Sequence, residues 1–186
     1  MAQPWKVSLH GGHSRAYCDH AHDPLRAMLD AAAAAGYHTF GVTEHAPRLG
    51  ARYLYDQEIA MGWTVEKLER DFAAYCKDIA ILAEEYDGRL CVLRGFEIET
   101  IPEDRYIDLM RAYRDQGKFE FMVGSVHFLH ELSIDGPPEI FEQAMDAAGG
   151  FEPLAVAYYD RVADRTAPKS PSFAPLICNR LKTAPA

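Results

Sequence analysis

The sequence predicts an α/β fold with a largely parallel sheet. Short β-rich segments alternate with longer segments of helical period along most of the chain, which is typical of strands joined by helical crossovers. The length of 186 residues suffices for one sizeable core, and 48% hydrophobic and 25% charged residues are ordinary globular usage. Polar residues that can do chemistry fall where the predicted strands end. We therefore expect one α/β domain with its functional site at the strand ends.

The first crossover helix is expected over 24–36, directly before the first well-defined strand. Asp23 is a residue type that caps helices, Pro24 suits the first turn, and Gly36 ends the pattern. The segment that follows, 38–43, is short and rich in residues that favour strands. This pair of segments is the first helix–strand unit of the predicted fold.

The second unit is a long amphipathic helix over 64–88, followed by a strand over 89–99. One face of the helix carries large apolar residues at helical spacing, which predicts that this face packs on the sheet. These residues are Leu68, Phe72, Tyr75, Ile79 and Leu82.

The remaining elements continue the alternation. A helix is expected over 103–116, closed by Gly117, and a third strand over 119–128. Helical patterns return over 138–148 and again over 152–163. The order of elements is that of an α/β protein up to this point.

The stretch HGGHSRAYCDHAH holds four of the eight histidines: His10, His13, His20 and His22. Neutral imidazole is a good ligand for zinc, iron or manganese, and neighbouring carboxylates widen the range of ions. Gly11 and Gly12 remove side-chain bulk, so the backbone can turn tightly and direct His10 and His13 at one point. Both a metal site and a polar surface loop remain open for this stretch.

Three later motifs end predicted strands with polar side chains. GVTEHAP presents His45, RGFEIE presents Glu97 and Glu99, and GSVHFLH presents His127. The two glutamates are two residues apart, so in a strand they share one face. They could bridge metal ions or form a solvated face, and a single strand-end histidine can equally be structural. No role is expected for His22, His38 or His130.

Other chemistries have little support. The sequence lacks the GxxxxGK[ST], GxGxxG and GxSxG motifs, and Cys18 near His20 is a weak candidate nucleophile. The net charge of −9 opposes binding to a nucleic-acid backbone. The four cysteines form no CxxC pair, and no long apolar run predicts a membrane span. We expect a cytoplasmic protein with neither nucleic acid nor membrane as a partner.

Taken together, HGGHS, CDHA, VTEHAP, GFEIE and GSVH occur in an order that resembles the polymerase-and-histidinol-phosphatase (PHP) superfamily of metal-dependent phosphoesterases. The histidinol-phosphatase branch is the most similar, and the resemblance covers about 7–163. It implies a distorted (β/α)7 TIM-like barrel that holds two or three divalent ions, zinc, iron or manganese, at the strand ends. The metal-binding and catalytic residues that it implies are His10, His13, His20, His45, Glu97 and His127.

The sequence departs from this family in two ways. The first motif is HGGH where the family usually has HxH, so His13 is expected to reach a metal through a bulge. The later GHxD-like motif and the final DxH-like pair have no counterpart, so we expect a barrel that is incomplete at its C-terminal end. From 165 onward the chain has four of its eleven prolines and no acidic residue. We therefore expect a partial barrel over 1–163 and a flexible, non-family tail over 164–186.

The function that the resemblance implies is hydrolysis of a small phosphorylated substrate, most specifically of histidinol phosphate in histidine biosynthesis. Missing ligands would make metal binding weak and turnover slow. Two alternatives are a PHP-type nuclease and a non-catalytic, metal-binding remnant. The oligomeric state is not predicted.

Overall fold

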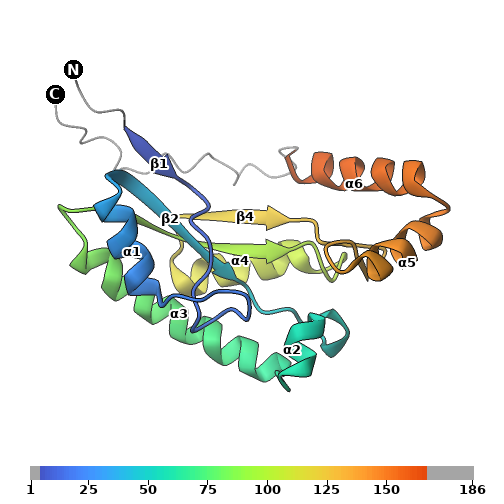
Figure 1. The fold of residues 1–186 in the computed structure, drawn as a ribbon, viewed down its shortest axis with the longest axis horizontal. Coiled ribbons are helices and arrows are strands. Elements are labelled where there is room, and N and C mark those ends of the chain that lie inside the picture. Colours follow the sequence, from blue (N-terminus) through green and yellow to red (C-terminus); the bar gives the residue numbers. More distant parts are fainter. Residues whose placement is uncertain (1–4, 167–186) are drawn as a thin grey trace.

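A computed structural model describes residues 5–166 and contains a four-stranded parallel sheet (Figure 1). The strands lie in sequence order, and each pairs in parallel with the next. They are β1 (Lys6–Ser8), β2 (Tyr37–His45), β3 (Cys91–Glu99) and β4 (Phe121–Ser125). A curled parallel sheet of this order, with helices between the strands, is part of an incomplete TIM-like barrel and confirms the predicted fold class.

The helices lie between the strands and beyond them. They are α1 (Leu25–Ala34), a one-turn 3₁₀ helix (Ala51–Tyr53), α2 (Asp56–Ala60), α3 (Val65–Glu85), α4 (Tyr106–Gly117), α5 (Pro138–Ala148) and α6 (Phe151–Thr166). In Figure 1, α1 and α3 lie below the sheet, while α5 and α6 form a separate pair at its far end. None of the helices within 5–166 is long and apolar enough to cross a bilayer.

The main core lies between the sheet and α1, α3 and α4. The apolar face predicted for the long helix is buried as expected: Phe72, Tyr75, Ile79 and Leu82 belong to this core, and Leu68 is buried outside it. Fully buried Tyr75 donates its hydroxyl to the carbonyl of Gly95 at 2.6 Å and lies 3.2 Å from that of Val42. Helix α3 therefore holds both central strands, β2 and β3, in place.

The third predicted strand is interrupted. The segment expected as one strand over 119–128 forms β4 and then, after a break, the first strand of a small antiparallel hairpin. The hairpin consists of β5 (Phe128–Leu129) and β6 (Leu132–Ser133). His127 therefore lies in the connection after β4 and not within a strand. The short elements β1 and α2 were not predicted, because three to five residues are too few to show a period.

One predicted helix cap is wrong, and another helix ends one residue later than expected. Pro24, and not Asp23, occupies the N-cap position of α1, with an extended ψ of 153°, so Asp23 lies one residue too early to cap. Gly117 is the last residue of α4, and Lys118 takes the left-handed conformation with a φ of 49°. The ring of Phe119 fills the space at Gly117, because a Cβ there would lie 2.2 Å from it. Close packing, and not a left-handed turn, explains this glycine.

Helices α5 and α6 pack on the hairpin through a second, smaller core of Val126, Leu129, Ala144 and Leu154. Helix α6 continues to Thr166, past the predicted domain boundary at 163. The rest of the predicted tail, 167–186, lies outside the described residues, as does Cys178. Cys18 and Cys76 are free thiols.

The face of the sheet opposite the helices is filled by Phe121. A Cβ on Gly95 would lie 2.5 Å from carbon atoms of the Phe121 ring, and a Cβ on Gly41 would lie 2.6 Å from it. Two glycines on neighbouring strands thus make room for one aromatic ring. The ring closes this face of the sheet below the strand ends that carry the polar motifs.

Substitution of Gly95 by Ala is therefore expected to displace Phe121 and to destabilise the protein by about 1–3 kcal/mol, the usual cost of overpacking. Urea denaturation would measure the change. Gly124→Ala in β4 is the control, because a Cβ there meets nothing within 4 Å. Equal stability of the two variants would show that the Phe121 ring moves aside without cost.

Candidate metal centre

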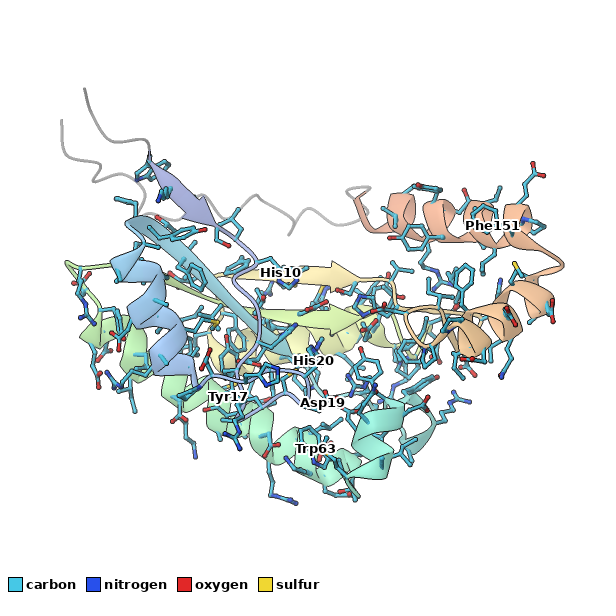
Figure 2. The ribbon with its side chains drawn as sticks, viewed as in Figure 1. His10, Tyr17, Asp19, His20, Trp63 and Phe151 are labelled. Atoms are coloured by element: carbon cyan, nitrogen blue, oxygen red, sulfur yellow. The ribbon has the colours of Figure 1, made fainter. Side chains whose placement is uncertain are left out.

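The polar motifs meet because neighbouring parallel strands end at the same edge of the sheet. His45 at the end of β2 pairs in register with Glu97 in β3. Glu97 and Glu99 share one face of β3, as their spacing predicts, while Phe96 and Ile98 face the helical core. The loop between β1 and α1 passes in front of this edge and carries His10, Asp19 and His20, which Figure 2 labels.

Glu97 lies at the centre of the site. Its side chain is buried, and its Oε2 lies 3.3 Å from His13 Nε2, 3.6 Å from His10 Nε2 and 3.8 Å from His45 Nδ1. Its other oxygen accepts a hydrogen bond from the hydroxyl of Ser125. Oε2 itself is buried and has no hydrogen-bond partner among the described residues. A buried carboxylate oxygen of this kind, surrounded by imidazoles, fits a bound cation.

Three imidazoles form a compact donor set beside Glu97. One nitrogen from each of His13, His20 and His45 lies within 4.8 Å of the other two. The rings of His13 and His45 stack with centroids 4.0 Å apart, and that of His20 is 5.2 Å from His13. Neutral imidazoles with a carboxylate are the donors that zinc, iron and manganese accept in proteins. These residues can therefore hold a metal ion.

The charge states also suit metal binding. Burial is the main cause, and the neighbouring His13 the second, of a pKa of His45 well below its usual value, so the ring stays neutral. Burial acts to raise the pKa of Glu97, but His13, His45 and Ser125 outweigh it and bring this pKa to about 2. The site thus presents an ionised carboxylate beside an uncharged imidazole.

The glycine bend brings His10 and His13 together, as the sequence predicts. Gly12 has a φ of 95°, which is left-handed and favours glycine, and the turn lies in the loop after β1. The predicted strand bulge is wrong, because β1 ends before this motif. A hydrogen-bond contact of 2.5 Å between His10 Nδ1 and Thr43 Oγ1 leaves His10 Nε2 directed at Glu97.

Glu44 supports the same loop from below. It is fully buried, its Oε1 accepts a hydrogen bond from the Ser14 backbone N–H at 2.7 Å, and its Oε2 lies 3.9 Å from His13 Nδ1. Burial raises the pKa of Glu44 to about 7. The sequence showed this residue only as the neighbour of His45.

His127 occupies another part of the site. Its Nδ1 lies 2.6 Å from Glu99 Oε1 and its Nε2 lies 3.7 Å from Asp135 Oδ2. The hydrogen bond to Glu99 raises the pKa of His127. The other five predicted residues form one group, with Glu97 and the four histidines His10, His13, His20 and His45 close together. His127 instead has Glu99 as its carboxylate partner.

All six predicted residues line one cavity of about 930 Å³, together with Arg52, Tyr55, Glu131 and Asp135 among others. A cavity of this size suits a small ligand. His22, His38 and His130 are absent from its lining. Of the additional residues at the site, Glu99 had a signal in its two-residue spacing from Glu97, and Asp19 and Glu44 lie within the CDHA and VTEHAP motifs, whereas Tyr55 lies in no motif.

Comparison with known proteins agrees with this geometry. The PHP domain model matches residues 9–167. The chain is 30% identical over 160 residues to a protein of Schizosaccharomyces pombe named "Probable histidinol-phosphatase", covering 85% of this chain and 51% of that protein. It is 31% identical over 135 residues to "Histidinol-phosphatase" of Saccharomyces cerevisiae, covering 68% of this chain and 40% of that protein.

The fold also matches a solved structure. The crystal structure of hisK from Listeria monocytogenes, described as a candidate histidinol phosphatase, superposes with a TM-score of 0.64 at 25% identity, covering 84% of this chain and 58% of that one. The chain spans about half the length of the curated relatives it matches. Because the family model matches most of its residues, and the ordered motifs meet at the strand ends, the chain belongs to the PHP domain family.

Proposed function

We propose that this chain is a metal-dependent phosphomonoester hydrolase that acts on histidinol phosphate and that holds two or three divalent ions. The observation that carries the proposal is the convergence of four histidines around the buried, unpartnered Oε2 of Glu97 and its neighbours. The names of the matched relatives support the choice of substrate.

The proposed ligands are the six residues that the sequence suggests: His10, His13, His20, His45, Glu97 and His127. Divalent ions at these residues would supply charge neutralisation for the phosphate and an activated water. Glu97 provides the fixed negative charge, and the neutral ring of His45 offers its lone pair. From outside the site, Thr43 orients the ring of His10, and Glu44 holds the loop beside His13 through the backbone N–H of Ser14.

The partner we propose is a small phosphorylated molecule, and not nucleic acid. The net charge of −9 opposes a long polyanion, whereas local cations would still attract a single phosphate group. The free thiols of Cys18 and Cys76 support a reducing compartment, and we propose the cytoplasm.

The test is phosphate release by the purified chain loaded with zinc, manganese or iron(II). We expect slow release from histidinol phosphate, faster than from glycerol phosphate, and loss of release after treatment with a chelator. Single-stranded DNA is the comparison substrate, since its preferential cleavage would favour a nuclease. Tight binding of two or three ions without any hydrolysis would favour a non-catalytic, metal-binding role.

A further inference from the structure

We infer that Tyr55 is a positioning residue that fixes the ring of His127 through Glu99. The inference deepens the proposed function, on which its consequence for turnover rests. Its structural part concerns only contacts among residues of this chain. None of the sequence motifs includes Tyr55, which lies in the segment between β2 and α3 at the wall of the cavity.

Glu99 is the link between the two residues. Its side chain is buried, and its Oε1 accepts a hydrogen bond from the Tyr55 hydroxyl at 2.9 Å and contacts His127 Nδ1 at 2.6 Å. Its Oε2 accepts from the backbone N–H of His127 at 3.3 Å. Both oxygens are therefore engaged, and the carboxylate cannot turn without losing a partner. The contact with Glu99 means that the proton of the neutral His127 ring lies on Nδ1. Nε2 is then the nitrogen that can bind a ligand in the cavity.

Tyr55 is itself held from three sides. The guanidinium carbon of Arg48 lies 3.9 Å from the centroid of its ring, and Phe128 stacks on it at 6.2 Å with an interplanar angle of 12°. Its backbone N–H donates to Glu58 Oε2 at 2.8 Å. Arg48 and Glu58 also form an ion pair, so the hydroxyl of Tyr55 is aimed by a rigid, buried support.

Tyr53 is the control that distinguishes a positioning role of the Tyr55 hydroxyl from simple packing of a tyrosine ring. It belongs to the same segment, is 1% exposed, and also packs on Phe128, with ring centroids 5.9 Å apart. Its hydroxyl, however, donates at 2.9 Å to Glu131, a partly exposed carboxylate that pairs with Arg52. The Tyr53 hydroxyl also accepts a hydrogen bond from Arg52 at 2.6 Å, so its loss removes at least as many hydrogen bonds as the loss of the Tyr55 hydroxyl. Only the Tyr55 hydroxyl, however, contacts the carboxylate that supports His127.

The experiment compares Tyr55→Phe with Tyr53→Phe, and uses Glu99→Gln as the positive control. Proton NMR of the imidazole N–H groups in metal-free protein, assigned with His127→Gln, reports the His127 Nδ1–H directly. We expect a downfield, slowly exchanging resonance in the wild type. Tyr55→Phe should move it upfield and speed its exchange with solvent, Glu99→Gln should abolish it, and Tyr53→Phe should leave it unchanged.

In the metal-loaded protein, Tyr55→Phe is expected to lower kcat for histidinol phosphate by roughly 10-fold with little change in KM, while Tyr53→Phe changes neither. Thermal denaturation of both variants checks that stability is not the cause. The inference is overturned if the wild type lacks the downfield resonance, or if the two tyrosine variants behave alike. Failure of the wild type to hydrolyse histidinol phosphate would refute the proposed function and leave the NMR result to decide the role of Tyr55.

Discussion

Replacement of Glu97 by Gln is expected to weaken the binding of zinc or manganese by at least roughly 100-fold, the upper end of the effect seen for residues that only support a ligand. Glu97 Oε2 lies within 4 Å of three imidazole rings and is ionised, with a pKa of about 2. An amide of the same shape removes this charge. Isothermal titration calorimetry measures the affinity directly.

The same variant should lose the thermal stabilisation that metal gives the wild type. An ion that binds only the folded chain stabilises it by about 2.7 kcal/mol at a concentration of 100 times its Kd, so weaker binding lowers the rise in Tm. Glu120→Gln is the matched control. Glu120 is a partly buried carboxylate that accepts from the backbone N–H of Arg94, outside the cavity. Equal affinities in the two variants would contradict a central role for Glu97.

The sequence predicts the centre of this site better than its surroundings, for a physical reason. Alternation of strand and helix predicts a parallel sheet, and a spacing of two places Glu97 and Glu99 on one face. Parallel strands end at one edge of the sheet, so His45 and Glu97, each at a predicted strand end, were expected at the same edge. The glycine bend at Gly12 has a local cause, and it too was predictable.

The unpredicted features depend on tertiary contacts. The hairpin of β5 and β6 has only two residues in each strand, too few to show alternation. The pairing of His127 with Glu99 depends on where β4 ends, and its interruption is invisible in the apolar pattern. Tyr55 reaches Glu99 across 44 positions of the sequence, and no local spacing encodes such a contact. Candidate ligands on regular strands are thus easier to predict than the side chains that contact them.

The buried ion pair between Arg48 and Glu58 gives the largest expected effect on stability. Their side chains are only 2% and 4% exposed, and Arg48 Nε has no hydrogen-bond partner among the described residues. Arg48→Met leaves the carboxylate of Glu58 buried without its cation, which is expected to cost about 3–5 kcal/mol in the free energy of unfolding. Urea denaturation monitored by tryptophan fluorescence would measure it.

Arg26→Met is the control for this variant. Arg26 pairs with Glu85 at 2.5 Å, but both side chains are largely exposed, so water replaces the lost partner and little change is expected. A loss of stability in Arg48→Met as small as that in Arg26→Met would mean that water reaches Glu58 in the variant.

The double variant Arg48→Met/Glu58→Leu separates the stability of this segment from its role at the site. Apolar residues in place of both partners leave no buried charge, so most of the lost stability should return. Tyr55 would still lack the guanidinium over its ring and the acceptor for its backbone N–H. Phosphate release should therefore stay low in a chain that is stable again. Recovery of both stability and phosphate release would show that the ion pair contributes only packing, and that other contacts suffice to orient the Tyr55 hydroxyl.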